Sequence, residues 1–271
     1  MALPSFMSVH VDSVRSVHGA SEETRSIITG SGFVLRHGGQ PFLVTNGHIV
    51  TGQHRVTGDP LGSAALPEFL DVALPMSGSG LGADEVALLG ISHRRLALYD
   101  DRGRARWLVH PTFGRRVDVV ALPIAEDNQG GVTGFTTTLL PYELGTSDPV
   151  AMLQPTQDLS VVGFPFGLHG GARSAIWVRG TIASEPDLPF EGESCFLVDS
   201  RTRAGQSGSP VILFRPSEEG TASAGAVAES WCLVGVYSGR TSGESDLGRV
   251  WTWSSLRAVV EGGERDVQVY D

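Results

Sequence analysis

The segment from Ala204 to Pro210 places Ser207 among small residues, directly before an apolar run. Glycine on both sides of the serine lets the backbone turn tightly. It also lets a substrate carbonyl approach the N–H groups of Gly205 and Ser207. A serine hydroxyl alone is a weak nucleophile, and it needs a base that is itself oriented by a third group. The sequence therefore predicts acyl-transfer chemistry here only if a histidine and an acid lie elsewhere in the chain.

Two upstream segments supply candidate partners for Ser207. His48 follows an apolar run, and Asp118, 70 residues later, precedes another. Ser207 comes a further 89 residues on, after the last histidine, His169. The order serine, acid, histidine cannot therefore be built around this serine, whereas the order histidine, aspartate, serine can. Three ordered blocks are far more specific than any one of them.

Together the blocks resemble the trypsin-like serine peptidases of the chymotrypsin fold, particularly bacterial members without disulfides. The similar segments are TGSGF at Thr29–Phe33, LVTNGHIV at Leu43–Val50, RVDVVAL at Arg116–Leu122 and GQSGSP at Gly205–Pro210. The match in order and spacing runs from about residue 27 to 261. The resemblance implies an all-β protein with two six-stranded antiparallel barrels, an active-site cleft between them and a short C-terminal helix.

The resemblance also implies a role for each matching residue. Ser207 would attack a peptide carbonyl, His48 would take its proton, and Asp118 would orient the imidazole. The N–H groups of Gly205 and Ser207 would form the oxyanion hole. In the family, a hairpin separates the histidine from the aspartate. Asp71, in the similar run FLDVAL, is an alternative acid, but it lies only 23 residues after His48, so we favour Asp118.

Substrate-binding residues follow from the same resemblance. Tyr237, Ser238 and Gly239 match the strand edge that pairs with a substrate and walls the specificity pocket. Arg201 matches the pocket floor, and Arg240 follows the wall strand. A desolvated arginine there would favour an acidic side chain before the scissile bond. The alternative is that both arginines point to solvent or pair with acidic neighbours.

One departure from the family concerns activation. Gln206 stands where an aspartate or asparagine is common, so the family's buried salt bridge from that aspartate to a trimmed N-terminus is not available. We therefore expect no activation by clipping. The long interval between His48 and Asp118 indicates an insertion within residues 51–90.

Turn residues divide the chain into short strand-like runs, as all-β folds require. A hairpin is expected across residues 27–50, turning at Gly38-Gly39. Six strands are predicted in the second half, at residues 161–164, 174–181, 195–198, 210–214, 233–237 and 249–253. Residues 254–261 have the serine cap and apolar spacing of a helix. A Gly-rich stretch at residues 126–134 is the expected link, giving domains at 1–130 and 131–271.

Composition excludes several classes of function. All 20 basic side chains of the 271 residues are arginine, so chemistry that needs a lysine amine is ruled out. A net charge of −10 argues against nucleic-acid partners, and no run of residues is apolar enough for a membrane span or signal segment. Only Cys195 and Cys232 are present, which favours a cytoplasmic location and two buried thiols. No metal-ligand spacing occurs, and we expect neither a metal nor a cofactor.

The sequence therefore favours a serine endopeptidase that acts on protein or peptide substrates. The alternative is a catalytically latent or decayed module of the same fold that binds peptides or serves as a scaffold. A regulatory protein partner would be one way to restrain an enzyme that has no clipping switch.

Overall fold

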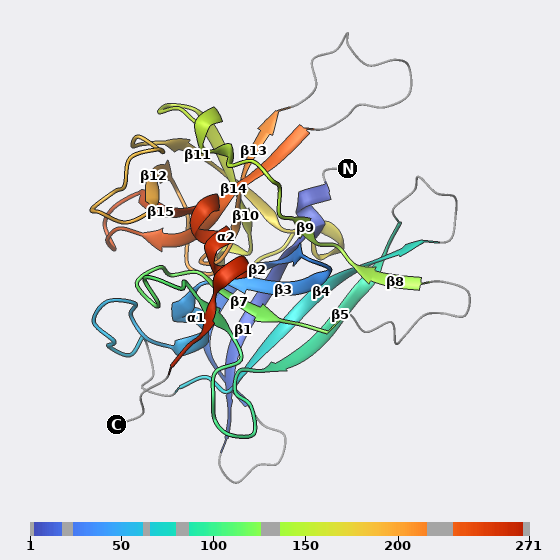
Figure 1. Cartoon of the computed structure of the whole chain (residues 1–271). Coiled ribbons are helices and arrows are strands. Elements are labelled where there is room, and N and C mark those ends of the chain that lie inside the picture. Colours follow the sequence, from blue (N-terminus) through green and yellow to red (C-terminus); the bar gives the residue numbers. More distant parts are fainter. Residues whose placement is uncertain are drawn as a thin grey trace.

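The computed structural model describes residues 3–17, 24–61, 66–79, 87–125, 136–215 and 230–267, about half of them in β-strands. In the C-terminal half, six antiparallel strands form a closed barrel (Figure 1). Their order around the barrel is β10 (Asp158–Gly163), β11 (Ile176–Ile182), β12 (Cys195–Ser200), β15 (Leu247–Thr252), β14 (Ser230–Arg240) and β13 (Pro210–Arg215). Each strand overlaps one of the six predicted runs, so the predicted C-terminal barrel is confirmed.

The N-terminal half is an open sheet of ten strands. Its main path runs β16 (Glu264–Arg265), β6 (Leu108–Val109), β7 (Val120–Pro123), β3 (Gln40–Thr45), β2 (Thr24–His37), β1 (Ser8–Ser16), β4 (Phe69–Ser79) and β5 (Ala87–Ala97). Off this path, β8 (Thr136–Leu139) pairs with β4, and β9 (Tyr142–Glu143) pairs with β2. The expectation of a second closed six-stranded barrel was therefore wrong for the described strands.

The β4–β5 hairpin explains why this sheet is open. Each strand is 11 residues long, and the hairpin extends away from the rest of the molecule, with β8 beside it (Figure 1). Among the described strands, β5 pairs with β4 alone, so the sheet has a free edge instead of a closing ladder. The insertion expected within residues 51–90 falls on this hairpin.

The chain crosses between the two halves more often than a single division implies. β8 and β9 follow residue 131 and yet pair with N-terminal strands, as does β16 near the end of the chain. The sheet pairing thus places residues 136–143 and 264–265 with the first half, whereas the predicted boundary at residues 130 and 131 assigns them to the second. The predicted link at 126–134 lies outside the described residues.

Strand alternation builds the interface that positions the site. Gly38 and Gly39 have φ values of +56° and +81°, so the β2–β3 hairpin turns where the sequence predicts. Successive β3 side chains point to opposite faces. Leu43 belongs to the core inside the N-terminal sheet, while Phe42 and Val44 belong to a second core shared with the C-terminal barrel. This shared apolar layer fixes the two halves against each other.

Helices are few and short. α1 (Gly47–Thr51) follows β3, and α2 (Trp253–Gly262) ends the C-terminal barrel. Short 3₁₀ turns lie at η1 (Leu3–Phe6), η2 (Pro149–Met152), η3 (Pro165–Gly167) and η4 (Gly171–Arg173). The cap of α2 is Thr252, whose hydroxyl accepts the Ser255 N–H at 3.3 Å, so the helix begins one residue before the predicted start. No helix in the described ranges is long and apolar enough to span a membrane.

The two cysteines are not joined to each other, and Cys195 is buried in β12. Burial raises the pKa of the Cys195 thiol to about 11, although nearby Arg249 and Arg55 act in the opposite direction. At pH 8 the native protein should therefore alkylate at Cys195 about 100-fold more slowly than the denatured chain, because the thiolate is the reactive form. Mass spectrometry of the Cys195 peptide after timed iodoacetamide treatment measures this. Equal rates in the two states would show that the thiol is accessible.

Candidate active site

His48 and Asp118 form a hydrogen-bonded pair at the junction of the two halves. His48 lies in the first turn of α1, and Asp118 lies two residues before β7. The Nδ1 atom of His48 is 2.7 Å from Oδ2 of Asp118, and the His48 backbone N–H donates to Oδ1 at 2.9 Å. The Asn46 side chain also donates to the Asp118 carbonyl at 2.6 Å. One carboxylate thus fixes both the ring and the backbone of the histidine.

Asp118 stays ionised although its side chain is only 3% exposed. Burial acts to raise its pKa, but the charge and hydrogen bonds of His48 and a hydrogen bond from Ser238 together lower it below the usual value. The Ser238 hydroxyl donates to Oδ2 at 2.6 Å. Gly47 leaves the room for this arrangement, since a Cβ there would lie 3.1 Å from Oδ1. The carboxylate is therefore a buried anion with three donors directed at it.

Ser207 lies on a tight turn beside the same stretch of β14 that holds Asp118. A Cβ built on Gly239 would lie 3.6 Å from the Ser207 hydroxyl oxygen, while the preceding residue, Ser238, binds Asp118. The dipeptide Ser238-Gly239 therefore adjoins both the acid and the serine. Among the hydrogen bonds of the described residues, none joins the Ser207 hydroxyl to the His48 ring.

Ser31 anchors the turn that carries Ser207. Its N–H donates to the Ser207 carbonyl at 2.8 Å, and its hydroxyl donates to the Gly205 carbonyl at 2.7 Å. The same hydroxyl accepts the Phe164 N–H at 3.0 Å. Ser31 is fully buried and comes from β2, so these bonds tie the turn to the opposite half of the molecule. Ser31 belongs to the TGSGF segment, but nothing in the sequence alone pointed to this anchoring role.

The backbone of the Ser207 turn leaves two donors without an internal acceptor. Gly205 has a φ of +92°, and a Cβ there would lie 2.5 Å from the Phe164 carbonyl oxygen, so only glycine fits. Within the described part of the chain, the N–H groups of Gly205 and Ser207 donate to no protein acceptor, whereas Gly208 donates to the Tyr237 carbonyl. These two donors are the pair that the sequence assigned to an oxyanion hole.

Gln206 is fully buried beside these donors. The side-chain amide oxygen of Gln206 accepts the backbone N–H of Arg203 at 2.9 Å, and the backbone N–H of Gln206 donates to the backbone carbonyl of Arg203 at 3.2 Å. This reciprocal pair closes the turn locally. The turn is therefore held by a neutral side chain at the position where the family's pattern has an aspartate or asparagine.

Residues predicted to bind substrate occupy different environments. Tyr237 is only 1% exposed, and its hydroxyl is hydrogen-bonded to that of buried Thr202, a residue that the sequence did not single out. Burial raises the pKa of Tyr237, so the phenol is protonated at neutral pH. Arg201 is exposed, as is Arg240.

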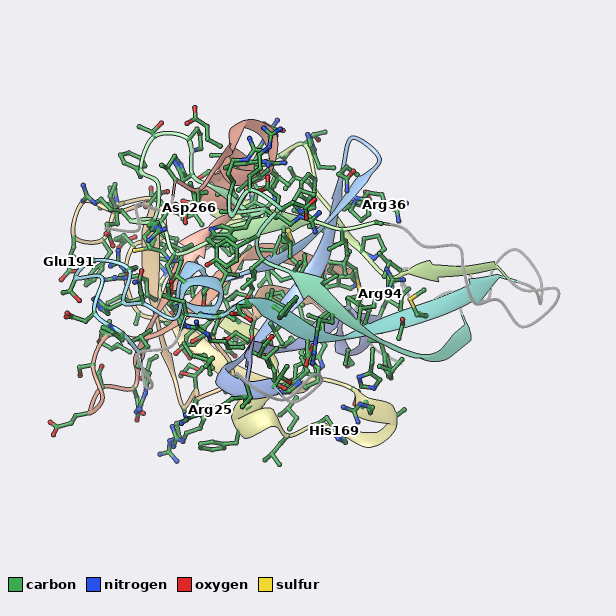
Figure 2. The ribbon with its side chains drawn as sticks, turned by 90° about the horizontal axis from the view of Figure 1, so that it is seen from below. Arg25, Arg36, Arg94, His169, Glu191 and Asp266 are labelled. Atoms are coloured by element: carbon green, nitrogen blue, oxygen red, sulfur yellow. The ribbon has the colours of Figure 1, made fainter. Side chains whose placement is uncertain are left out.

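A cavity of about 250 Å³ lies against His48 and Asp118, bounded by Ser238 to Thr241 on one side. Its other lining side chains are His54, Arg55, Leu61 and Arg249. Arg55 binds Glu193 through both guanidinium Nη atoms, at 2.7 and 2.9 Å. Arg249 pairs with Glu191, which lies at the margin of the molecule in Figure 2. Arg240 forms no ion pair with any described residue and is the free positive charge of this cavity.

Asp71, the alternative acid, is not part of this arrangement. It belongs to β4 and forms a two-pronged salt bridge with Arg95 of β5, both contacts at 2.7 Å, on the exposed surface. Figure 2 shows Arg94, the neighbour of Arg95, well separated from Glu191. His48 contacts Asp118 and not Asp71.

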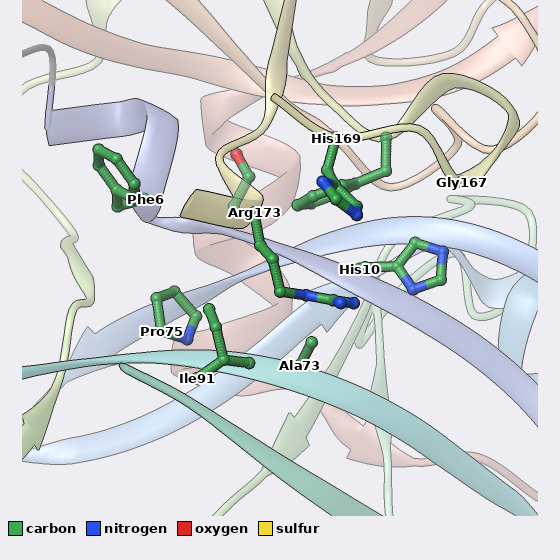
Figure 3. A pocket seen from close by; sticks show the side chains of 10 residues that line it. Phe6, His10, Ala73, Pro75, Ile91, Gly167, His169 and Arg173 are labelled. Atoms are coloured by element: carbon green, nitrogen blue, oxygen red, sulfur yellow. The ribbon is translucent and has the colours of Figure 1, made fainter. Parts of the chain in front are cut away.

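A second cavity, of about 40 Å³, lies between β1, β4, β5 and the segment 164–173 (Figure 3). In Figure 3 the side chain of Arg173 extends toward His10, with His169 above it. The pKa of His10 is lowered, chiefly by burial, and the charges of Arg173 and His169 add to this effect. None of His48, Asp118 and Ser207 lines this cavity. Nowhere in the described ranges do three His, Cys, Asp or Glu side chains come together in a way that could hold a metal ion.

Comparison with known proteins gives one match to a family and several to solved structures. The model of the trypsin-like peptidase domain matches residues 30–215. The active form of the Rv3671c protease from M. tuberculosis is 14% identical, with 98% of this chain and 85% of that chain covered at a TM-score of 0.45. The HtrA-type protease AlgW with a tripeptide is 13% identical, with 95% and 61% covered at a TM-score of 0.49.

No curated protein matches the sequence. The family match covers more than half of the chain and includes His48, Asp118 and Ser207. It also contains the segments Leu43–Val50, Arg116–Leu122 and Gly205–Pro210, on which the resemblance rests. The chain belongs to the family of trypsin-like peptidase domains.

Proposed function

We propose that this protein is a serine endopeptidase that hydrolyses peptide bonds through an acyl-enzyme, with His48, Asp118 and Ser207 as its triad. One observation carries the proposal. The buried Asp118 carboxylate binds Nδ1 of His48, and the same stretch of β14 that holds this carboxylate lies against the Ser207 hydroxyl. A proton on Nδ1 leaves Nε2 with a free electron pair, which is the form that a general base requires.

In the first half-reaction, the Ser207 oxygen bonds to the substrate carbonyl carbon while His48 Nε2 takes the hydroxyl proton. The N–H groups of Gly205 and Ser207 receive the developing oxyanion, each contributing about 3 kcal/mol to transition-state stabilisation. The C–N bond then breaks, and His48 returns the proton to the leaving amine. In the second half-reaction, the oxygen of a water molecule bonds to the acyl carbon while His48 Nε2 takes a water proton. The C–O bond to Ser207 then breaks, His48 returns the proton to the Ser207 oxygen, and the acid product leaves.

The ionised Asp118 stabilises the imidazolium that forms in both steps. Without the negative charge of Asp118, whose side chain is almost wholly buried, the imidazolium would have no counter-ion. An unpaired charge in such a site is costly. The hydrogen bond from Ser207 to His48 forms in this proposal when substrate binds. Catalytic hydrogen bonds are often long without substrate and tighten in the complex.

Labelling with a fluorophosphonate tests the nucleophile. Ser207 Oγ should displace fluoride from phosphorus in the wild type, and Ser207→Ala should lose all labelling. Ser209→Ala is the matched control, because Ser209 is fully buried and its hydroxyl has no hydrogen-bond partner within the described structure. Labelling of that variant should equal the wild type.

Two results would contradict the proposal in different ways. Persistent labelling of Ser207→Ala would place the nucleophile elsewhere. A well-folded wild type that neither labels nor cleaves a denatured protein substrate would favour the latent peptide-binding module instead.

A further inference from the structure

The residue before the scissile bond must place its side chain close to Ser207. In the acyl-enzyme, the carbonyl carbon is bonded to the Ser207 oxygen, and the adjoining Cα is only one bond further away. The side chain on that Cα must therefore contact the segments that flank the serine. In this structure those segments are residues 201–206, which precede Ser207, and the end of β14 from Tyr237 to Arg240.

The Tyr237 side chain occupies the space between these two segments. Its hydroxyl reaches across to Thr202, five residues before Ser207, and both residues are only 1% exposed. On the barrel side, the ring lies against Gly248 of β15, where any Cβ would overlap it. The absence of a side chain at Gly248 thus makes room for the ring.

Tyr237 is held in this position by its backbone as well. Its N–H donates to the Ser209 carbonyl at 2.9 Å, and its carbonyl accepts the Gly208 N–H at 2.8 Å. Gly208 and Ser209, the two residues that follow the nucleophile, are thus bonded directly to the residue whose ring fills the space. A large side chain of a substrate could enter only by displacing a buried, hydrogen-bonded ring, which carries a high energetic cost.

The open space beside the triad lies elsewhere. The 250 Å³ cavity is lined by His48, Asp118 and Ser238 to Thr241, and its lining includes neither Thr202 nor Tyr237. Arg240 lines this cavity, and exposed Arg201 does not. Arg240 thus lines a different space from the one that Tyr237 and Thr202 occupy, and Arg201 is exposed.

We infer that the enzyme cleaves after small residues such as glycine, alanine and serine, because the Tyr237 ring fills the space that a larger side chain would require. This inference rests on the proposed function and specifies its substrate class. It replaces the expectation of an acidic residue at that position, which depended on Arg201 or Arg240 lying there.

Four peptidyl diphenyl phosphonates that differ only in the side chain before the reactive phosphorus test the inference. Ser207 bonds to phosphorus and phenoxide leaves, so each labelling rate reports the fit of one side chain. The wild type should react with the alanine probe at least ~100-fold faster than with the phenylalanine, glutamate or arginine probe. Tyr237→Ala should raise the rate with the phenylalanine probe by ~100-fold and change the alanine rate far less.

Tyr237→Phe is the control, since it keeps the ring and removes only the hydroxyl, and it should keep the wild-type order of rates. If Tyr237→Ala fails to fold, Tyr237→Leu leaves a smaller opening. That variant should also raise the labelling rate of the phenylalanine probe relative to that of the alanine probe. Wild-type rates that are equal for alanine and phenylalanine, or fastest for glutamate, would overturn the inference while leaving the peptidase intact. Failure of all four probes and of a fluorophosphonate would overturn both.

Discussion

Asp118→Asn should lower kcat/KM by about 10⁴-fold, because the amide both removes the negative charge and favours the wrong imidazole tautomer. In the structure, Oδ2 of Asp118 receives His48 Nδ1 at 2.7 Å and the Ser238 hydroxyl at 2.6 Å. An asparagine nitrogen in the place of Oδ2 would direct its own N–H groups at two other donors, the Nδ1–H of His48 and the Ser238 hydroxyl. An oxygen placed there instead would leave the other amide group against the His48 backbone N–H. Steady-state hydrolysis of a peptide that the wild type cleaves measures the loss.

Asp71→Asn is the matched control for this variant. Asp71 is the other aspartate that the sequence offers as the acid, but its salt bridge to Arg95 is half exposed on the β4–β5 hairpin. Surface pairs of this kind contribute at most about 1 kcal/mol to stability, and kcat/KM should stay within twofold of the wild type. A large loss in Asp71→Asn, with little loss in Asp118→Asn, would reverse the assignment of the acid.

Sequence patterns were most informative where function depends on short segments in a fixed order. His48, Asp118 and Ser207 each lie beside a strand that an apolar, β-rich run predicts, and the six C-terminal strands fall close to their expected positions. The pairing of His48 with Asp118 rather than Asp71 followed from the spacing that the family's inserted hairpin requires. These features are local, or they are set by the order of the segments along the chain.

Features that depend on distant contacts could not be predicted in this way. The hydroxyl of Ser31 binds the carbonyl of Gly205, 174 residues away, and no local pattern encodes that partner. The free edge of the N-terminal sheet depends on how far β4 and β5 extend, and β16 joins that sheet from the far end of the chain. Likewise, the sequence pattern assigned Tyr237 to the pocket wall, but the contact of its hydroxyl with Thr202, 35 residues away, is not encoded locally.

Gly208→Ala should destabilise the protein by about 2–5 kcal/mol, the sum of backbone strain and overpacking. Gly208 has a φ of +88°, where a Cβ is strained, and that Cβ would overlap the Ser31 carbonyl oxygen and lie 2.5 Å from the Thr45 hydroxyl. The hydroxyl of Thr45 already donates to the Ser31 carbonyl at 2.7 Å, so neither group can move without breaking this buried bond. Thermal unfolding should show a fall in Tm of about 10 °C.

Gly103→Ala separates the two contributions to this loss. Gly103 has a φ of +71°, but nothing lies within 4 Å of the position that its Cβ would occupy. That variant should lose only the ~1–2 kcal/mol of left-handed backbone strain. A similar Tm for both variants would show that the turn around Ser207 yields to an added methyl group. The bonds from Ser31 would then not hold the nucleophile rigidly, and peptidase activity should survive in Gly208→Ala.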